Sequence, residues 1–273
     1  MHSVKFGLIL SNPDRLNKTM KKRIIFAILI GIITAGFVVI FLTPNSRSQN
    51  KSPTIEEIPI VDLYVPEPDD PLQKEVQKNR AAKYDTGTPI ANAPDPEDEY
   101  LELPLSHAPV EPALPITKSD LIVIGKVSEA RAFLSNDRSN VYCEFSVRIE
   151  RLLKNTGSAK LNTNSEIIAE RVGGRVRFSS GKIQLRGRYG RELPAKDNRY
   201  LLFLQWSESG KDFVIITGYR IQNENVIPLD ANTKDSNLPV FKNYDSLRNA
   251  NLENVVGQVK STLSSSSKEA LDK

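Results

Sequence analysis

The sequence of 273 residues contains little cysteine and histidine, and this scarcity excludes whole classes of site. A single cysteine, Cys143, rules out an intrachain disulfide, so an exported domain must be stabilised by packing alone. The two histidines, His2 and His107, lie outside the segment that we expect to be globular. Zinc sites of the usual type and Ser/His/Asp or Cys/His catalytic groups need an imidazole, so we expect no metal, no cofactor and no such catalytic residue.

Proline, apolar residues and charge are distributed unevenly along the chain and divide it into zones. Thirteen of the seventeen prolines lie between Pro44 and Pro115, and only the part after residue 115 has the composition to bury a sizeable core. The predicted organisation is a basic tail (1–23), an apolar helix (24–43), an acidic proline-rich linker (44–115), a β-rich domain (116–230), a loop and amphipathic helix (231–263) and a disordered tail (264–273).

The charge-free run at residues 24–42 is long enough to cross a membrane as a helix. At about 1.5 Å per residue it spans roughly the 30 Å of a bilayer's hydrocarbon core. Five cations at 15–23 precede it, and only Arg47 and Lys51 follow it closely. The positive-inside rule therefore predicts a cytoplasmic N-terminus, a signal anchor in the inner or plasma membrane, and a periplasmic or extracellular C-terminal domain. The alternatives are a cleaved signal peptide, although no clear small-x-small site follows the run, and a buried core helix, although such helices normally keep a polar stripe.

Small residues recur at every fourth position of this apolar run. Ala27, Gly31 and Ala35 would line one face of the helix and allow a second copy to approach closely. A homodimer formed through this face is one interpretation. The other is that alanine and glycine are simply common in membrane helices.

The proline-rich segment cannot continue a helix or a sheet, and its excess of acids favours an extended chain. We therefore predict a disordered spacer between the membrane and the domain. Residues 72–83 have the composition of a short helix. The apolar residues at 58–65 either dock on a partner as an extended peptide or are ordinary members of a disordered segment.

From Leu121 onward, short β-rich runs are separated by turn residues. Alternation is clearest at 141–150, where Val141, Cys143 and Phe145 begin the apolar face. The strands are expected at residues 121–127, 141–150, 166–172, 175–188 (a hairpin), 200–206, 213–216 and 226–227. Strands at this spacing without intervening helices predict a mainly β fold, a small antiparallel barrel or sandwich, followed by a helix with its apolar face at 252–263.

Three segments carry a resemblance to a known group of proteins: DLIVIGKV at 120–127, VRIERLLK at 147–154 after Tyr142, and RYLLFL at 199–204. In these the chain resembles uncharacterised bacterial envelope proteins with a single barrel similar to an OB-fold of the netrin or metalloproteinase-inhibitor type. The resemblance covers about residues 119–230 and implies an OB-like barrel. Inhibitors of that fold use an N-terminal cysteine to reach zinc, and this chain has no cysteine there.

The densest basic region lies on the predicted hairpin. Its candidate anion-binding residues are Arg175, Arg177, Lys182, Arg186 and Arg188, which we expect to form a basic outer face. The alternative is a solvated edge that resists aggregation. The glycines around this hairpin lack the spacing of a phosphate-binding loop. Nucleic acid is not an expected ligand, because the domain is predicted to be exported.

Other candidate chemistry is weak. Cys143 lies on the apolar face of its strand, where a thiol behaves as a small hydrophobe. Glu144 and Glu150 share a face but lie roughly 20 Å apart at about 3.3 Å per residue, too far to act as a catalytic pair. The sequence thus favours a membrane-anchored envelope binding or assembly module that recognises an anionic polymer or another envelope protein. An envelope hydrolase or protease regulator and a purely structural tether remain the alternatives.

Overall fold

The structure, a computed structural model, describes residues 57–64, 70–90, 100–103, 111–157, 160–188, 190–230 and 242–271. No helix within these ranges is long and apolar enough to cross a membrane. The anchor predicted at 24–43, with Ala27, Gly31 and Ala35, lies outside the described residues.

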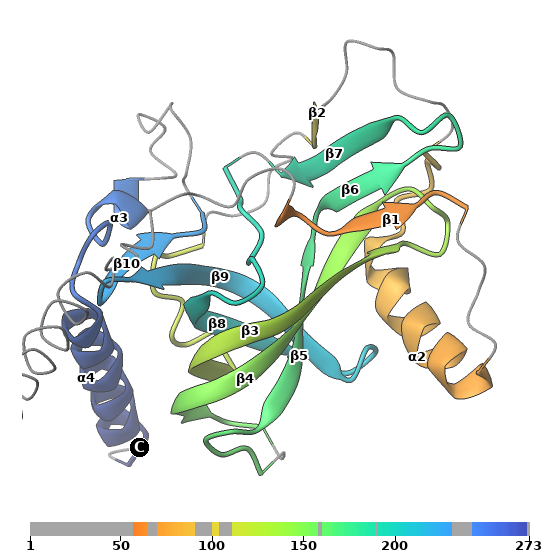
Figure 1. Cartoon of the computed structure of the whole chain (residues 1–273). Coiled ribbons are helices and arrows are strands. Elements are labelled where there is room, and N and C mark those ends of the chain that lie inside the picture. Colours follow the sequence, from red (N-terminus) through yellow and green to blue (C-terminus); the bar gives the residue numbers. More distant parts are fainter. Residues whose placement is uncertain are drawn as a thin grey trace, which may run out of the picture. The chain divides into compact units, whose positions relative to one another are not determined.

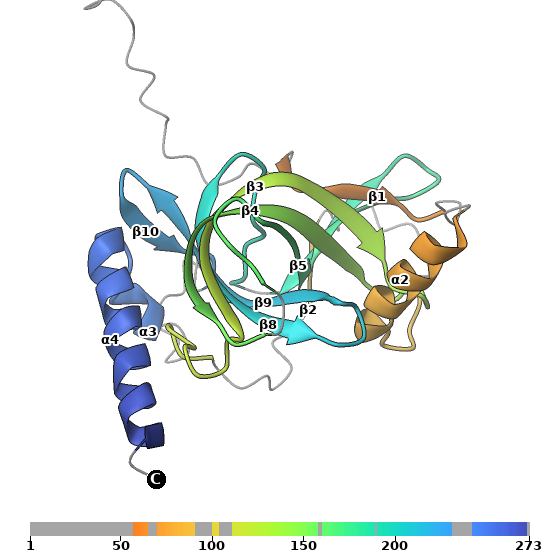
Figure 2. The same ribbon diagram turned by 90° about the horizontal axis from the view of Figure 1, so that it is seen from below.

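A six-stranded sheet that curls into a barrel forms the centre of the fold (Figures 1 and 2). Its strands follow the order β10-β9-β5-β4-β3-β8, and β9 also pairs with β8, which closes a ring of five strands. All pairings in this sheet are antiparallel except the short parallel pairing of β5 with β9. The strands are β3 (Leu121–Leu134), β4 (Val141–Asn155), β5 (Glu166–Val172), β8 (Arg199–Ser207), β9 (Asp212–Gln222) and β10 (Asn225–Pro228). The mainly β prediction is confirmed.

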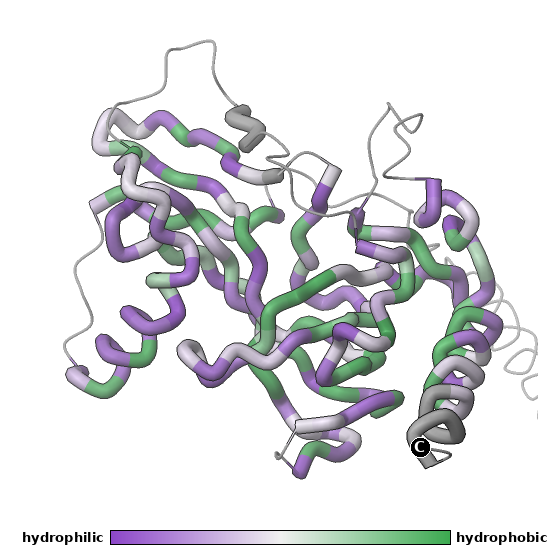
Figure 3. The backbone as a smooth tube through the Cα atoms, turned by 180° about the vertical axis from the view of Figure 1, so that it is seen from behind, coloured by the Kyte–Doolittle hydropathy of each residue, from purple (hydrophilic) through white to green (hydrophobic). Residues whose placement is uncertain are grey.

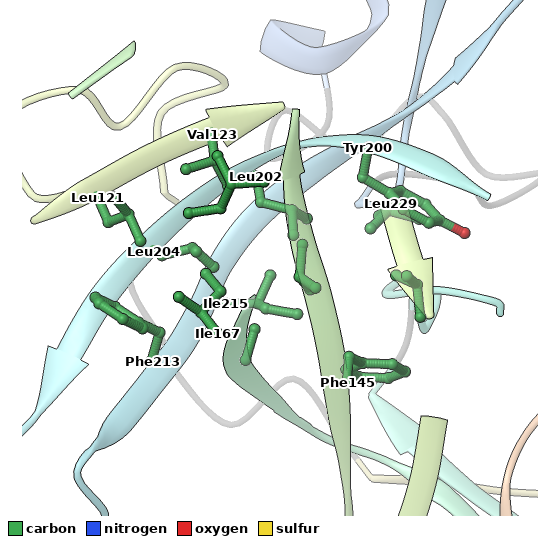
Figure 4. Close-up of a cluster of buried hydrophobic side chains, with 14 of the residues drawn as sticks. Leu121, Val123, Phe145, Ile167, Tyr200, Leu202, Leu204, Phe213, Ile215 and Leu229 are labelled. Carbon is green, nitrogen blue, oxygen red and sulfur yellow. The ribbon is translucent and has the colours of Figure 1, made fainter. Parts of the chain in front are cut away.

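The start of β3 is buried on both faces, which explains its unbroken apolar run. Leu121 and Val123 point into the barrel, where they meet Leu202 and Leu204 (Figure 4). Ile122 and Ile124 belong instead to a second core. Cys143 lies in the barrel interior, its thiol donates to the Gly173 carbonyl at 3.1 Å, and burial raises its pKa. The prediction that Cys143 packs in the core is confirmed.

Gly125 marks a local irregularity in β3. The register between β3 and β4 shifts between Ile124 and Gly125, and a Cβ at Gly125 would lie 2.6 Å from the Val147 side chain and 2.8 Å from the Arg148 carbonyl oxygen. Only glycine fits this close approach of two strands.

A long C-terminal helix, α4 (Leu252–Leu271), covers the second core. The side chain of Asn251 accepts a hydrogen bond from the Glu253 amide at 3.0 Å and so caps its first turn. The predicted apolar face is confirmed, because Leu252, Val255, Val256 and Val259 are buried. A short helix, α3 (Lys242–Asp245), adds Tyr244 to the same core. The tail predicted to be disordered is helical as far as Leu271, because α4 continues beyond its buried face.

The basic hairpin forms the middle of a second, four-stranded sheet. β6 (Gly174–Arg177) and β7 (Ile183–Arg188) pair antiparallel around the predicted turn, where Gly181 has a φ of +82°. Two strands from the N-terminal side add to its edges: β1 (Ile60–Asp62) runs parallel to β6, and β2 (Tyr100–Leu103) runs parallel to β7. The hairpin is therefore not the solvated free edge that one interpretation of the sequence required.

The prediction of a disordered spacer is wrong for several stretches of residues 44–115. Besides β1 and β2, the chain forms helix α2 (Pro71–Ala81) and a 3-10 turn, η2 (Ala82–Tyr84). Asp70 caps α2 by accepting from the Leu72 amide at 3.0 Å, and Pro71 occupies its first turn. The helix predicted at 72–83 is thus confirmed. Figure 3 shows that α2 is mostly hydrophilic, so polar contacts must hold it in place.

Candidate functional site

Three carboxylates from three strands of the barrel form what we call the carboxylate cluster: half-buried Glu144 of β4, buried Glu170 of β5 and buried Asp212 at the start of β9. Glu144 and Glu170 are direct partners in the antiparallel β4–β5 ladder, so their side chains leave the sheet on the same face. The parallel pairing of β5 with β9 brings Asp212 beside them. Glu170 is fully buried and Asp212 is 2% exposed. Like charges in this arrangement repel each other, so the cluster needs compensating cations.

Arg80 and Lys83, from α2 and η2, supply those cations. Arg80 Nη1 donates to Glu144 Oε2 at 2.9 Å, and its Nε lies 3.0 Å from Asp212 Oδ2. Lys83 Nζ contacts Glu170 Oε1 and donates to Asp212 Oδ1 at 2.9 Å. Because Arg80 and Lys83 are three residues apart, they extend from one side of a helical turn and reach the cluster together.

Two further groups, at the end of β8 and in the β8–β9 turn, accept hydrogen bonds from these cations. Lys83 Nζ donates to Ser207 Oγ at 3.1 Å, and Arg80 Nε donates to the Gly210 carbonyl at 3.1 Å. A Cβ on Gly210 would lie 2.6 Å from Lys83 Nζ and 2.4 Å from Asp212 Oδ1. The absence of a side chain at this position therefore makes room for the lysine.

A tyrosine pair lies next to the cluster. Tyr84 of η2 stacks on Tyr142 of β4 with ring centroids 4.6 Å apart. The Tyr142 hydroxyl is buried and has no hydrogen-bond partner among the residues that the structure describes. Burial raises the pKa of Tyr142, and the charges of Glu144, Glu170 and Asp212 raise it further. The hydroxyl thus lies within electrostatic reach of the carboxylates and is an unused donor beside them.

Burial dominates the electrostatics of the acids themselves. It raises the pKa of Glu170 to about 8, Lys83 opposes the change, and the charge of Asp212 reinforces it. Burial likewise raises the pKa of Glu144, against the influence of Arg80. Three ionised carboxylates facing two cations would leave an excess negative charge. A protonated Glu170 at neutral pH removes that excess.

Residues 70–90, which we call the capping segment, contact the barrel through polar groups along α2 and η2, and through Ile90, which packs in a small apolar cluster with Val141 and Val176. Ala81 is the one buried residue of α2, whereas Leu72 and Val76 are exposed. After η2 the backbone is held by the β3–β4 loop through side-chain and main-chain hydrogen bonds. These run from Asn140 Nδ2 to the Tyr84 carbonyl (2.8 Å), from the Gly87 amide to Asp137 Oδ2 (2.7 Å) and from the Ile90 amide to the Arg138 carbonyl (2.8 Å).

The arrangement is suited to binding positively charged groups. It offers fixed carboxylates, a hydroxyl and a carbonyl around two cationic side chains, in an environment where burial strengthens ionic contacts. Among the residues that the structure describes, no group of histidine, cysteine and acidic side chains is arranged to hold a metal ion.

The basic residues predicted to bind an anion do not share one face. In the β6–β7 ladder Arg175 and Arg177 lie opposite Leu185 and Ile183, whereas Arg186 lies opposite Gly174 on the other face. Burial lowers the pKa of Arg186. Lys182 is exposed in the turn, and Arg188 stands at the end of β7 in register with Leu103. The single basic outer face is therefore wrong, because the ladder separates its members.

The N-terminal strand also engages this hairpin. Arg175 Nε donates to the Ile58 carbonyl at 2.7 Å, and Arg177 Nη1 lies 3.3 Å from Asp62 Oδ1. The described part of the predicted extended peptide, residues 58–64, thus docks within its own chain on the strand that carries these arginines.

Sequence reasoning missed the carboxylate cluster. It compared Glu144 with Glu150 on the same strand, and Glu150 instead pairs with Arg199 at 2.8 Å. The signal that could have directed attention to the cluster is Glu170, an acid inside the apolar run EIIAERV at 166–172. Its partners come from other strands, so only the register identifies them.

A second buried ion pair serves the fold. Arg171 contacts Asp230, which also accepts from Thr217, and Arg171 Nη1 donates to the Glu192 carbonyl at 3.0 Å. This pair links β5 to the chain after β10.

In comparisons with known proteins, no protein-family model matches the chain, and no curated protein matches it.

Proposed function

We propose that this chain is a membrane-anchored binding module of a cell envelope, which presents its barrel outside the membrane and recognises a positively charged partner through the carboxylate cluster. The anchor is the apolar run at 24–42, and the exported orientation rests on the charges that flank it. The partner belongs to the class of envelope proteins with a basic segment.

The observation that carries this proposal is how α2 and η2 are held. Their attachment depends on Arg80 and Lys83 entering the carboxylate cluster, and α2 buries little apolar surface. A helix needed only to cover a core would direct an apolar stripe toward it. α2 and η2 instead direct one cation each toward the barrel, Arg80 and Lys83, as a charged ligand would.

The topology of the barrel supports the resemblance to an OB-fold. Five strands close in the order β3-β4-β5-β9-β8, with one parallel pairing between the third strand of the ring and β9. Folds of this class are frequently binding modules, although the fold alone does not specify the ligand. The ligand class is inferred from the cluster.

A charged probe tests the proposal. In the uncapped variant, Arg80→Ser with Lys83→Ser, the full-length chain in detergent should bind labelled hexa-arginine more tightly than the wild type, because the carboxylates have lost their internal partners. When Glu144→Gln and Asp212→Asn are added to the uncapped variant, this increase in affinity should be lost. The chain carries a formal net charge of +4, so general attraction for a polycation is small. Equal binding by all three proteins would overturn the proposal.

An envelope hydrolase is the second candidate, and the pKa of Glu170 is the observation that favours it. A buried carboxylic acid with a raised pKa beside a second buried carboxylate, Asp212, is the arrangement of a general acid and its partner. Hydrolysis of chromogenic glycosides or peptides by the uncapped variant, lost on Glu170→Gln, would support this candidate. Hydrolysis that persists in Glu170→Gln would exclude it.

A further inference from the structure

The capping segment leaves part of the site unsatisfied. Within the described part of the chain, the buried Tyr142 hydroxyl has no hydrogen-bond partner, although it lies on the strand that carries Glu144. Burying a hydroxyl without a partner is unfavourable, and evolved interiors rarely retain such a group without a reason. An occupant that served only the fold would be expected to satisfy the hydroxyl.

We propose that the carboxylate cluster is a receptor site for a basic peptide of a partner protein, with an arginine and a lysine three residues apart on a helical turn, and that the capping segment occupies this site in cis until the partner displaces it. The inference rests on the proposed function and specifies its ligand.

The geometry of the present occupant defines the ligand class. Arg80 spans Glu144 and Asp212, and Lys83 spans Glu170 and Asp212, so Asp212 joins the two cationic positions. A guanidinium suits the first position, because its planar fork reaches two carboxylates at once. A compact ammonium suits the second, where the missing side chain of Gly210 leaves room for it.

The capping segment is able to act as a competitor because it belongs to the same chain. A tethered ligand is present at a high effective concentration, so even modest ionic contacts keep the site occupied. A partner peptide that also supplies an acceptor to the Tyr142 hydroxyl gains a hydrogen bond that the capping segment does not make. That difference favours displacement of the capping segment by the partner peptide.

The test uses a labelled synthetic peptide of residues 70–90 as the probe, with full-length protein and fluorescence anisotropy. The native peptide should bind the uncapped variant about tenfold more tightly than it binds the wild type, a difference of about 1.4 kcal/mol. Lys74→Ser with Lys78→Ser is the matched control, since it removes two exposed charges from the same helix outside the cluster. This control should behave as the wild type does.

A second peptide, in which the residues at positions 82 and 83 are exchanged, tests the spacing. Its arginine and lysine are two residues apart and no longer share a helical face, so it should bind about tenfold more weakly. Equal, tight binding of both peptides would overturn the spacing claim and leave the proposed function standing. If neither peptide nor hexa-arginine bound the folded uncapped variant, both proposals would fail.

Circular dichroism and the emission of Trp206, the only tryptophan, report whether the uncapped variant is folded. If it is not, a photoreactive group at the position of Tyr84 in the peptide tests the wild type. It should label the fragment that carries Tyr142, on which Tyr84 stacks in the intact chain. Unlabelled native peptide should suppress this labelling better than the exchanged peptide. No labelling, or equal suppression by the two peptides, would overturn the inference.

Discussion

Glu170 is the residue on which the charge balance of the site depends. It stands opposite Glu144 in the β4–β5 ladder, and Lys83 contacts both Glu170 and Asp212. Because its folded-state pKa is raised from 4.5 to about 8, the folded protein binds this proton more tightly than the unfolded chain does. The associated stability is fully present below about pH 4.5 and is lost as the pH rises through about 8.

Glu170→Gln should flatten this pH dependence. In wild type we expect the free energy of unfolding, measured by urea titration, to fall between pH 5 and pH 8 and then level off. In Glu170→Gln the neutral amide cannot ionise, so the fall should be much smaller, with Glu144 contributing what remains. Identical profiles for the two proteins would mean that Glu170 stays ionised in the folded state.

A substitution at Gly210 would disturb the attachment of the capping segment without changing any charge. In Gly210→Ala the added methyl would lie 2.6 Å from Lys83 Nζ and 2.4 Å from Asp212 Oδ1, so the lysine must shift. We expect faster proteolytic cleavage within residues 70–90 than in wild type, while the barrel stays folded. Gly257→Ala on α4 is the control, because its Cβ meets nothing within 4 Å. Equal cleavage of the two variants would show that the missing side chain of Gly210 is not needed for Lys83 to bind at the cluster.

At the scale of elements, the hairpin and its added strands show why composition misled the sequence analysis. Proline and acidic charge predict disorder for residues 44–115, yet a strand as short as Ile60–Asp62 is stabilised by pairing with β6 and by the burial of Val61. Such long-range pairing leaves no periodic signal in three residues. The barrel strands and α4 are longer and their apolar patterns are clear, so the sequence predicts them.

The split of the basic residues leads to a revised prediction for anion binding. Arg175→Gln with Arg177→Gln should lower the affinity for heparin by about tenfold, or about 1.4 kcal/mol, and make it less dependent on salt. Arg186→Gln should have little effect, because Arg186 is half-buried on the opposite face. Asp62→Asn should strengthen binding, since it removes the acid that pairs with Arg177. A comparable loss in Arg186→Gln would show that the two faces do not act separately.

At the scale of the whole molecule, the sequence predicts the barrel and the C-terminal helix but not the candidate site. Apolar alternation at 141–150 and helical spacing at 252–263 are local signals, and both recur in the structure. The carboxylate cluster joins residues from three strands with cations from a segment about 60 to 130 positions away. No spacing along one strand reveals such a convergence. Closure of the barrel and the docking of residues 70–90 produce it.

The predicted topology has its own test. Protease added outside intact cells or spheroplasts should remove the barrel and leave a short protected fragment, because the flanking charges predict a cytoplasmic N-terminus. A clipped N-terminus with a protected barrel would reverse the orientation. A mature chain that begins near Thr43 would instead show that the apolar run is a cleaved signal.

Amide hydrogen exchange on the wild-type chain tests whether the capping segment is a displaceable occupant of the carboxylate cluster. Segments held by few buried apolar contacts open without global unfolding. We therefore predict that amides of residues 72–90 exchange through a local opening at least about 2 kcal/mol below that of β4, and that higher salt accelerates them selectively. Protection equal to that of β4 at every salt concentration would contradict the account, because the segment would then be an integral part of the barrel.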